Sequence, residues 1–543
     1  MIVRAVRTHV VDFLHFIRAS STIEHMLTKS DLASFRQCSR KLWLEHHRPD
    51  LVPENDPTLW RRANDGNIVG AKARELLGKN SIWPTPADDP AAAATAAAAQ
   101  LFGNPAQPAV EVPMLRDGLY ARADALIPAP SGGYVLRETK ASTFRLKKDK
   151  VTLDKPEEHH LDDLAIQAWV YQASGWRFAG AELNLLNNQW RYPGNGDYSG
   201  LFRQLPVAAD IVGRISEVAG WSAASERVLA GAMPSVQTGA QCSKPYDCAF
   251  YDHCKTLDAP GPQHPLTLLP GAAGKSLARK LNQQHGHTSL LEPQPSEFTG
   301  TDAALYRRMQ IAHRTGQPVL EPGSAAPLAG LPYPRYYFDF EGIDLPVPRW
   351  AGVRPYEQIP FQWSCHIERA PGVFDHVEFL DLSGNEPSIP CIERMLEAIP
   401  PDGTGPILVY YQTYEVGRLR ELAERHPQYA AAVNQYLARI VDLHPMVRAN
   451  YYCPAMLGSF SIKAVLPTIA PDLDYGSLDE VTNGTAAQVA YLYAALDPQT
   501  TPGRKAELRD RLLVYCKQDT WAMVEVAYFL QRQTRPPPPT AIP

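Results

Sequence analysis

Three equally spaced cysteines constrain this chain more than any other feature. They lie in CSKPYDCAFYDHC, residues 242–254, as Cys242, Cys248 and Cys254. Eight cysteines in 543 residues are too few for a disulfide framework, so a reducing, cytoplasmic compartment is expected. Two interpretations stay open at this point: the three thiolates belong to a metal site, or they are unrelated buried thiols.

Composition and charge limit the function classes. Apolar residues make up 45% of the chain and charged residues 20%, as in ordinary globular proteins. The net charge of −5 gives no global basic field, so nucleic-acid binding would depend on local basic patches. No run approaches the roughly 20 apolar residues of a membrane span, and Asp12 and His15 interrupt the apolar start, so no secretory signal is expected.

The length predicts two or three domains. Helices alternate with strand-like runs over residues 26–256, which predicts an α/β domain with a hairpin-rich mixed sheet, and residues 1–25 are expected to be an extension. Prolines and glycines bound a helical linker at 257–332. A second α/β domain with helices flanking a mixed sheet is predicted at 333–532, followed by a proline-rich tail at 533–543.

A first set of polar residues lies on a predicted hairpin. Asp124 is in ARADAL, and Glu138 and Lys140 are two apart in RETK, so the latter two face one side of a strand. Two carboxylates suit Mg²⁺ or Mn²⁺, and the lysine would steady an attacking water or a phosphate. A surface Glu–Lys pair is the alternative interpretation.

On the following helix, Gln167 and Tyr171 are four apart and are expected to share a face. Asp…Glu-x-Lys followed by Gln-x-x-x-Tyr resembles the RecB-like branch of the PD-(D/E)XK nucleases, which implies a restriction-endonuclease-like fold and a catalytic role for these five residues. The chain departs from the family at one position. The family often has a histidine four residues after an upstream glycine, whereas Gly66 is followed at that spacing by Gly70.

The same resemblance bears on the cysteines. One cysteine before a RecB-like core and three after it resembles the arrangement that ligates a 4Fe–4S cluster, which implies Cys38 as the fourth ligand. Zinc is the alternative, although structural zinc sites usually contain C-x2–4-C pairs and none occurs here. A structural cluster is expected, and it would clamp the two ends of the nuclease domain.

A second acidic set lies in the C-terminal half. In YYFDFEGID, Asp339 and Glu341 alternate with phenylalanines on one apolar strand, where unpartnered carboxylates would be costly. Near the end, Tyr515 and Asp519 share a face of an apolar helix at i, i+4. Bound divalent metal ions would offset the cost of the buried charges. A sheet edge that carries acids is the alternative interpretation.

Asp-x-Glu with a late Tyr-x-x-x-Asp resembles the DEDDy branch of the DnaQ-like 3′–5′ exonucleases, which implies an RNase H-like fold. The resemblance implies Glu415 as a further ligand at the start of a helix, with Asp442 less favoured. It also implies that Asp339, Glu341, Glu415 and Asp519 hold two metals and that Tyr515 orients or deprotonates the attacking water. Lys463 is expected either to support this site or to be solvated.

The two halves in this order resemble an uncharacterised bacterial family that joins a RecB-like, iron–sulfur nuclease domain to a DnaQ-like domain. The resemblance implies a metal-dependent nuclease, acting on DNA with RNA as the alternative. A nucleic-acid-binding or adaptor protein with one or both sites inactive is the competing hypothesis. No G-x-x-x-x-G-K-[ST] motif occurs, so a helicase would be a partner. Repair and defence against foreign DNA both stay open.

Overall fold

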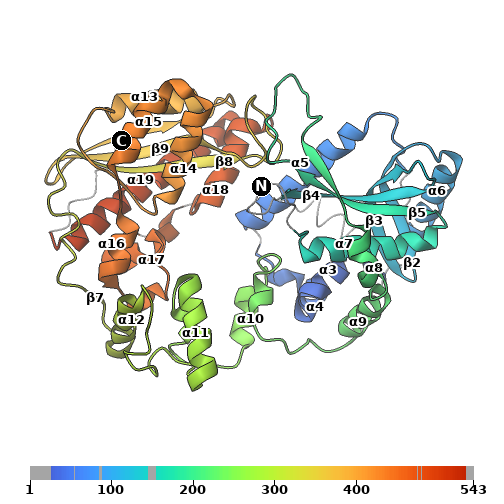
Figure 1. Ribbon diagram of the computed structural model, residues 1–543, viewed down its shortest axis with the longest axis horizontal. Coiled ribbons are helices and arrows are strands. Elements are labelled where there is room, and N and C mark those ends of the chain that lie inside the picture. Colours follow the sequence, from blue (N-terminus) through green and yellow to red (C-terminus); the bar gives the residue numbers. More distant parts are fainter. Residues whose placement is uncertain are drawn as a thin grey trace. The chain divides into compact units, whose positions relative to one another are not determined.

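In the computed structural model the chain forms two compact units (Figure 1). Unit 1 contains the chain up to Ala259 and Leu345–Tyr356, and unit 2 contains Pro260–Asp344 and the chain from Glu357 onward. The described residues are 26–53, 56–84, 89–144, 155–473, 475–478 and 480–533. The expected extension at 1–25 and nearly all of the expected tail lie outside them. Among the described helices, none is long and apolar enough to cross a membrane.

Unit 1 is a mixed six-stranded sheet with helices packed against it. The strands follow the order β1-β3-β4-β5-β6, with β2 paired to β3. Three neighbouring pairs are antiparallel, β2 with β3, β3 with β4 and β5 with β6, whereas β1 with β3 and β4 with β5 are parallel. The strands are β1 (Leu27–Thr28), β2 (Ala109–Arg116), β3 (Leu119–Pro128), β4 (Tyr134–Thr143), β5 (Phe178–Leu186) and β6 (Phe202–Pro206). The helices are α3 (Lys29–Gln37), α4 (Ser39–His47), α5 (Pro57–Leu77), α6 (Pro90–Gly103), α7 (Glu158–Tyr171), α8 (Ala208–Ile215), α9 (Val218–Ala230) and α10 (Tyr251–Leu257).

The first helical segment is interrupted at a cysteine. Thr28 caps α3 through a capping box with Asp31, which satisfies free N–H groups of the first turn. Cys38 has an extended backbone with φ −165° and ψ 125°, so α3 ends at Gln37 and α4 starts at Ser39. This break sets Cys38 between two short helices. By contrast, the alanine-rich run forms α6, as expected for the best helix former.

Unit 2 contains a mixed five-stranded sheet in the order β10-β9-β8-β11-β12, together with the small β13–β7 pair. β8, β9 and β10 are antiparallel neighbours, whereas β11 is parallel to both β8 and β12. The strands are β7 (Val319–Leu320), β8 (Arg335–Asp344), β9 (Gln358–Ala370), β10 (Val373–Leu380), β11 (Ile407–Val409), β12 (Ile440–Asp442) and β13 (Tyr451–Tyr452). The helices are α11 (Gly271–His285), α12 (Ala303–Thr315), α13 (Ser388–Ala398), α14 (Thr413–Arg425), α15 (Ala430–Arg439), α16 (Leu443–Asn450), α17 (Ile462–Ile469), α18 (Gly484–Tyr491) and α19 (Pro502–Leu530).

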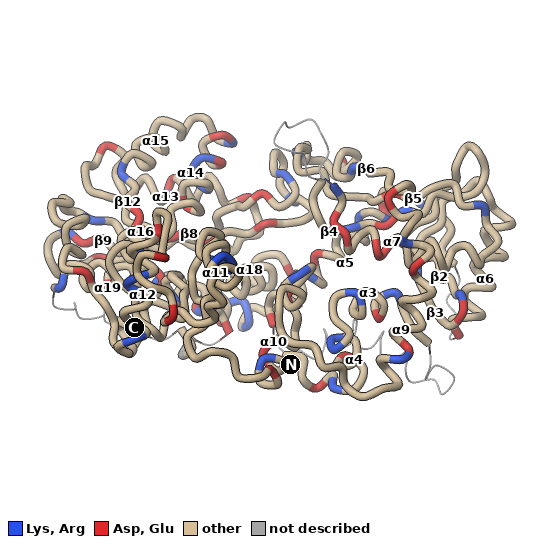
Figure 2. Tube along the Cα trace, turned by 60° about the horizontal axis from the view of Figure 1, so that its bottom comes forward, with Lys and Arg blue, Asp and Glu red and all other residues tan. Residues whose placement is uncertain are grey.

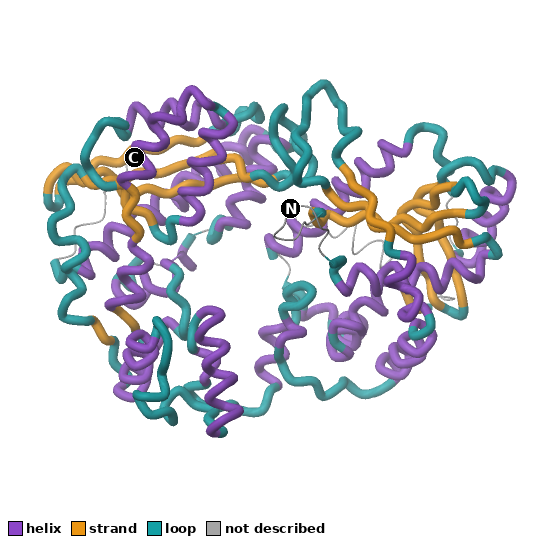
Figure 3. The backbone as a smooth tube through the Cα atoms, in the orientation of Figure 1, coloured by secondary structure: helices purple, strands orange, loops and turns teal. Residues whose placement is uncertain are grey.

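Two separate cores cover the two faces of this sheet. Phe338 and Phe340 of β8 pack with residues of α13, α14 and α15, whereas Tyr337 packs with residues of α16 and α19. Figure 3 shows helices on both sides of the strands of unit 2. The second core also contains α11 and α12, so the segment expected to be a helical linker is helical and packs within unit 2. The predicted mixed α/β class is confirmed in both units.

Charged residues of both signs are interspersed along the two units, as Figure 2 shows. This distribution agrees with the small net charge of the sequence. A site for a polyanion or a cation must therefore be identified from local clusters of side chains.

Candidate metal centres

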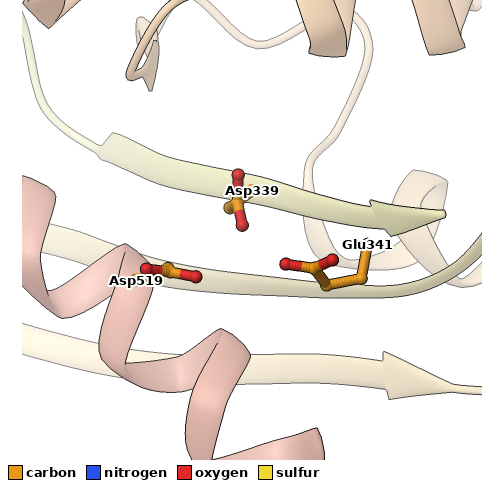
Figure 4. A group of neighbouring side chains, drawn as sticks. All are labelled: Asp339, Glu341 and Asp519. Carbon is orange, nitrogen blue, oxygen red and sulfur yellow. The ribbon is translucent and has the colours of Figure 1, made fainter. Parts of the chain in front are cut away.

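The carboxylates of β8 meet α19 on one face of the unit 2 sheet. Because side chains alternate along a strand, Asp339 and Glu341 point away from the aromatic core that holds Phe338 and Phe340. Asp519 of α19 faces them, and one carboxylate oxygen from each of the three acids lies within 4.8 Å of the others. Figure 4 shows the three side chains around a common space.

Glu415 joins this group from the first turn of α14. It is buried and makes a side-chain hydrogen bond with Asp339. Its second oxygen, Oε2, is buried and has no hydrogen-bond partner among the described residues. A buried carboxylate oxygen without a partner is costly, and a bound cation would remove that cost. The donor set of four carboxylates therefore fits Mg²⁺ or Mn²⁺, which prefer oxygen ligands.

Two tyrosines and a lysine lie around Asp519. Tyr475 donates its hydroxyl hydrogen to Oδ1 of Asp519, and Tyr515 also hydrogen-bonds to that carboxylate. Lys463 of α17 donates to the Tyr515 hydroxyl oxygen at 3.0 Å and to the carbonyl oxygen of Thr482 at 2.8 Å. Lys463, expected either to support the site or to be solvated, thus contacts it directly. Tyr475 was not predicted, because the single 3-10 turn that it begins, Tyr475–Ser477, is too short to carry a periodic signal.

The four carboxylates, Lys463 and Tyr515 line a cavity of about 390 Å³. Burial, followed by repulsion from Asp519, raises the pKa of Glu341 to about 8, and Lys463 acts in the opposite direction. Burial also raises the pKa of Asp339, with repulsion from Asp519 and Glu341 as the next causes. The cavity therefore concentrates more negative charge than the side chains around it compensate, which is the condition for binding divalent cations.

The predicted acidic residues of unit 1 also meet, but lysines accompany them. Glu138 of β4 is buried, and its Oε1 lies 2.7 Å from Nζ of Lys29 and 2.9 Å from Nζ of Lys140. Gln167 of α7 donates from Nε2 to Oε2 of Glu138 at 2.6 Å. The structure thus brings Glu138, Lys140 and Gln167 together, as expected. Burial acts to raise the pKa of Glu138, but Lys140 and Lys29 outweigh it and lower that pKa.

Two further residues of this site were missed from the sequence. Asp163 hydrogen-bonds to Lys140 and lies 3.8 Å from Nζ of Lys29. Its signal was available, because it precedes Gln167 by four residues on the same helix. Lys29 carried no comparable signal, because it comes from the first residue of α3, 109 positions from Glu138. Asp124 accepts a hydrogen bond from the backbone N–H of Thr139 at 2.8 Å, and burial, then Glu138, raises its pKa to about 7.

Tyr171 and Gly70 lie apart from these ion pairs. Tyr171 was expected beside Gln167, but its hydroxyl donates to the carbonyl oxygen of Arg177 at 3.1 Å, and its ring packs near Trp176. The two side chains share a helix face at i, i+4, but only Gln167 contacts the carboxylate of Glu138. Gly70 of α5 and Asp124 line one small cavity, so the glycine stands where a side chain would approach that acid.

The four N-terminal cysteines line one cavity of unit 1, together with Arg40 and Lys41. Hydrogen bonds join the α3–α4 segment to the chain before and within the cysteine stretch: Gln37 donates to the carbonyl oxygens of Gln241 and Tyr246, and Arg40 donates to that of Pro234. Burial raises the pKa of the Cys248 and Cys254 thiols. The cysteines that line this cavity are Cys38, Cys242, Cys248 and Cys254.

Comparisons with known proteins give no activity. The model of a family described as a domain of unknown function, DUF2779, matches residues 336–461, which include Asp339, Glu341 and Glu415. An uncharacterised protein of Ureaplasma parvum, UU173, is 24% identical over 217 residues, which cover 36% of this chain and 31% of that protein. The chain thus aligns with about a third of that relative. The crystal structure of SSO0001 matches with a TM-score of 0.26 and 17% identity, over 44% of this chain and 88% of that one.

Proposed function

We propose that this chain is a metal-dependent nuclease whose principal site is the acidic cavity of unit 2. One observation carries the proposal: four carboxylates from β8, α14 and α19 converge in a cavity that Tyr515 and Lys463 also line. The order of these residues along the chain is that of a DEDDy exonuclease, so 3′–5′ trimming of nucleic acid is the expected activity. DNA is the expected substrate, and RNA is the alternative.

The residues have distinct roles in this proposal. Asp339, Glu341, Glu415 and Asp519 would hold divalent cations, which when bound supply a more acidic water and charge neutralisation at a phosphate. Tyr515 lies at the cavity and would orient the attacking water through its hydroxyl group. Lys463 holds the Tyr515 oxygen in place by donating a hydrogen bond to it. The buried walls of the cavity strengthen each of these interactions.

A cleavage assay tests this proposal. The chain is incubated with Mn²⁺ and a 5′-labelled single-stranded DNA or RNA, and Asp339→Asn and Glu138→Gln are compared with the unchanged protein. A ladder of products shortened from the 3′ end, lost in Asp339→Asn, is expected. No metal-dependent cleavage of any strand would contradict the enzyme proposal, and loss in Glu138→Gln alone would move the activity to unit 1.

A second candidate function is favoured for the unit 1 site. The resemblance assigns a metal to Asp124 and Glu138, yet the ammonium group of Lys29 lies 2.7 Å from Glu138, and Gly70 supplies no ligand. A site neutralised by its own lysines fits the binding of nucleic acid without cleavage, or an adaptor role. If it does cleave, Asp124 and Glu138 would hold Mg²⁺ or Mn²⁺, and Lys140 would steady the phosphate.

For the four cysteines we propose a structural 4Fe–4S cluster, with zinc as the alternative. All four cysteines line one cavity of unit 1, which supports a single group held by the four thiolates. Brown protein with iron and sulfide after anaerobic purification, lost in Cys38→Ser, is the expected result. Colourless protein that contains zinc would contradict it.

A further inference from the structure

Tyr411 has an unusual backbone beside the acidic cavity of unit 2. It lies between β11, which ends at Val409, and α14, which begins at Thr413. Its φ is +70°, a left-handed conformation that a tyrosine rarely adopts, and its side chain is 58% exposed. The chain therefore combines backbone strain with an exposed aromatic ring at one position.

The carboxylate of Asp442 holds this conformation. Its Oδ1 accepts the N–H groups of Tyr411 and His444, each at 2.9 Å, and its Oδ2 accepts the N–H of Gln412 at 3.1 Å. Asp442, the less favoured metal ligand of the sequence analysis, is thus bound to backbone. The Tyr411 ring meets His444 edge to face, at a centroid distance of 5.0 Å and an angle of 83°. One edge contact leaves most of the ring exposed.

The position of Tyr411 connects it with the cavity. Its neighbour Tyr410 lines that cavity, and so do Tyr414 and Glu415 in the first turn of α14. Strained conformations persist where the surrounding structure enforces them, and they cluster at functional sites. An exposed ring next in sequence to the lining of a site proposed for phosphodiesters can bind a base, because every nucleic-acid base presents a flat face that stacks on an aromatic side chain.

We propose that Tyr411 is a stacking platform for an unpaired base of a single-stranded nucleic acid near the acidic cavity. This inference rests on the proposed nuclease function and adds a substrate class to it: strands whose terminal bases are unpaired. Stacking has little sequence preference, so the platform would accept different bases. Asp442 is a positioning residue in this arrangement, because it fixes the backbone that presents the ring.

The test measures binding of a 5′-labelled dT12 by the full chain, with Ca²⁺ in place of Mn²⁺. Tyr411→Ala is expected to weaken binding about tenfold, equivalent to about 1.4 kcal/mol, whereas Tyr411→Phe stays within about twofold of the unchanged protein. Val373→Ala, which removes a 55% exposed side chain from another part of unit 2, is the control and is expected to bind normally. An oligonucleotide with abasic 3′-terminal nucleotides should bind Tyr411→Ala and the unchanged protein equally.

Tyr411→Gly separates loss of stacking from loss of folding. Glycine adopts positive φ without strain, so this variant should have a higher midpoint of thermal unfolding and still bind dT12 about tenfold more weakly. Unchanged affinity in Tyr411→Ala would overturn the platform and leave the nuclease proposal intact. An equal loss on the abasic strand would also overturn it. If the unchanged protein neither binds nor cleaves any single strand, both proposals fail.

Discussion

The two acidic sites use similar residues but differ in how their charge is balanced. In unit 1, Lys29 and Lys140 face the carboxylates of Asp124, Glu138 and Asp163. In unit 2, Lys463 lines the cavity of the four carboxylates but donates to a tyrosine and a backbone carbonyl, and Arg418 acts on Glu415. The pKa of Glu138 is accordingly lowered, whereas that of Glu341 is raised to about 8.

This difference shows that a motif of acids does not by itself define a metal centre. The sign of the pKa shift at a buried carboxylate depends on whether a cation from elsewhere in the chain reaches it. Lys29 contacts Glu138 although the two residues are 109 positions apart in the sequence. Among the described neighbours of Asp339, no lysine lowers the pKa of that carboxylate in the same way. We therefore expect the unit 2 site to depend on added cations more strongly than the unit 1 site.

The largest expected effect is on metal affinity in unit 2. Glu415→Gln and Asp519→Asn should each weaken the tightest Mn²⁺ binding by about 100-fold or more, because a neutral amide replaces an anionic ligand. A Mn²⁺ titration followed by electron paramagnetic resonance measures this. Glu138→Gln is the matched control in unit 1 and should leave the tight sites unchanged. A lower number of tight sites in Glu138→Gln would show that the two sites do not differ in the proposed way.

The second effect is on stability, and it concerns the lysine that distinguishes unit 1. Lys29→Met should lower the free energy of unfolding by about 2 kcal/mol, because it leaves Glu138 buried with one fewer cation. The expected value is below that of a fully buried pair, since the Lys29 side chain is 22% exposed. Urea unfolding measures it, and added Mn²⁺ should restore part of the loss.

Arg48→Met is the control for that measurement. Arg48 forms a 2.7 Å ion pair with Asp50 in the same unit, but both side chains are exposed, so its removal should leave the stability unchanged. Equal losses in the two variants would show that the Lys29 pair is an ordinary surface contact. The charge balance argued for unit 1 would then be wrong.

The third effect separates positioning from metal binding in unit 2. Lys463→Met should lower kcat about tenfold, equivalent to about 1.4 kcal/mol, because the Tyr515 hydroxyl loses the donor that holds it. Mn²⁺ affinity should stay unchanged, because the four carboxylates remain. Lys280→Met, on the exposed part of α11, is the control. Loss of Mn²⁺ binding in Lys463→Met would assign the lysine to the metal centre instead.

The sequence predicted what depends on short-range periodicity. Asp339 and Glu341 share a strand face, and Tyr515 and Asp519 share a helix face, so their convergence required only that α19 pack on β8. Lys29 and Tyr475 were not predictable in this way, because their contacts join segments with no periodic relation. Tyr171 shows that periodicity can also mislead. It shares a helix face with Gln167, but its ring packs near Trp176 and its hydroxyl donates to the carbonyl oxygen of Arg177.

The smallest expected effect concerns Gly70, the position where the resemblance to RecB-like nucleases breaks down. Gly70→Ala should raise the free energy of unfolding by about 0.5–1 kcal/mol, since the residue lies inside α5 and alanine favours a helix. An added Cβ would meet only Nη1 of Arg74, at 3.3 Å, the far end of a long side chain that is ion-paired with Glu111 and would have to shift by a few tenths of an ångström.

Gly70→His adds an imidazole to the cavity that Asp124 lines, and it should create weak additional Mn²⁺ binding in unit 1. The gain should be larger when combined with Lys29→Met, because the ammonium group then no longer competes for Glu138. Gly66→His, one turn earlier on the exposed part of the same helix, is the matched control and should add none. If Gly70→His binds Mn²⁺ as tightly with Lys29 present as without it, the lysine does not neutralise this site, and the contrast between the two units disappears.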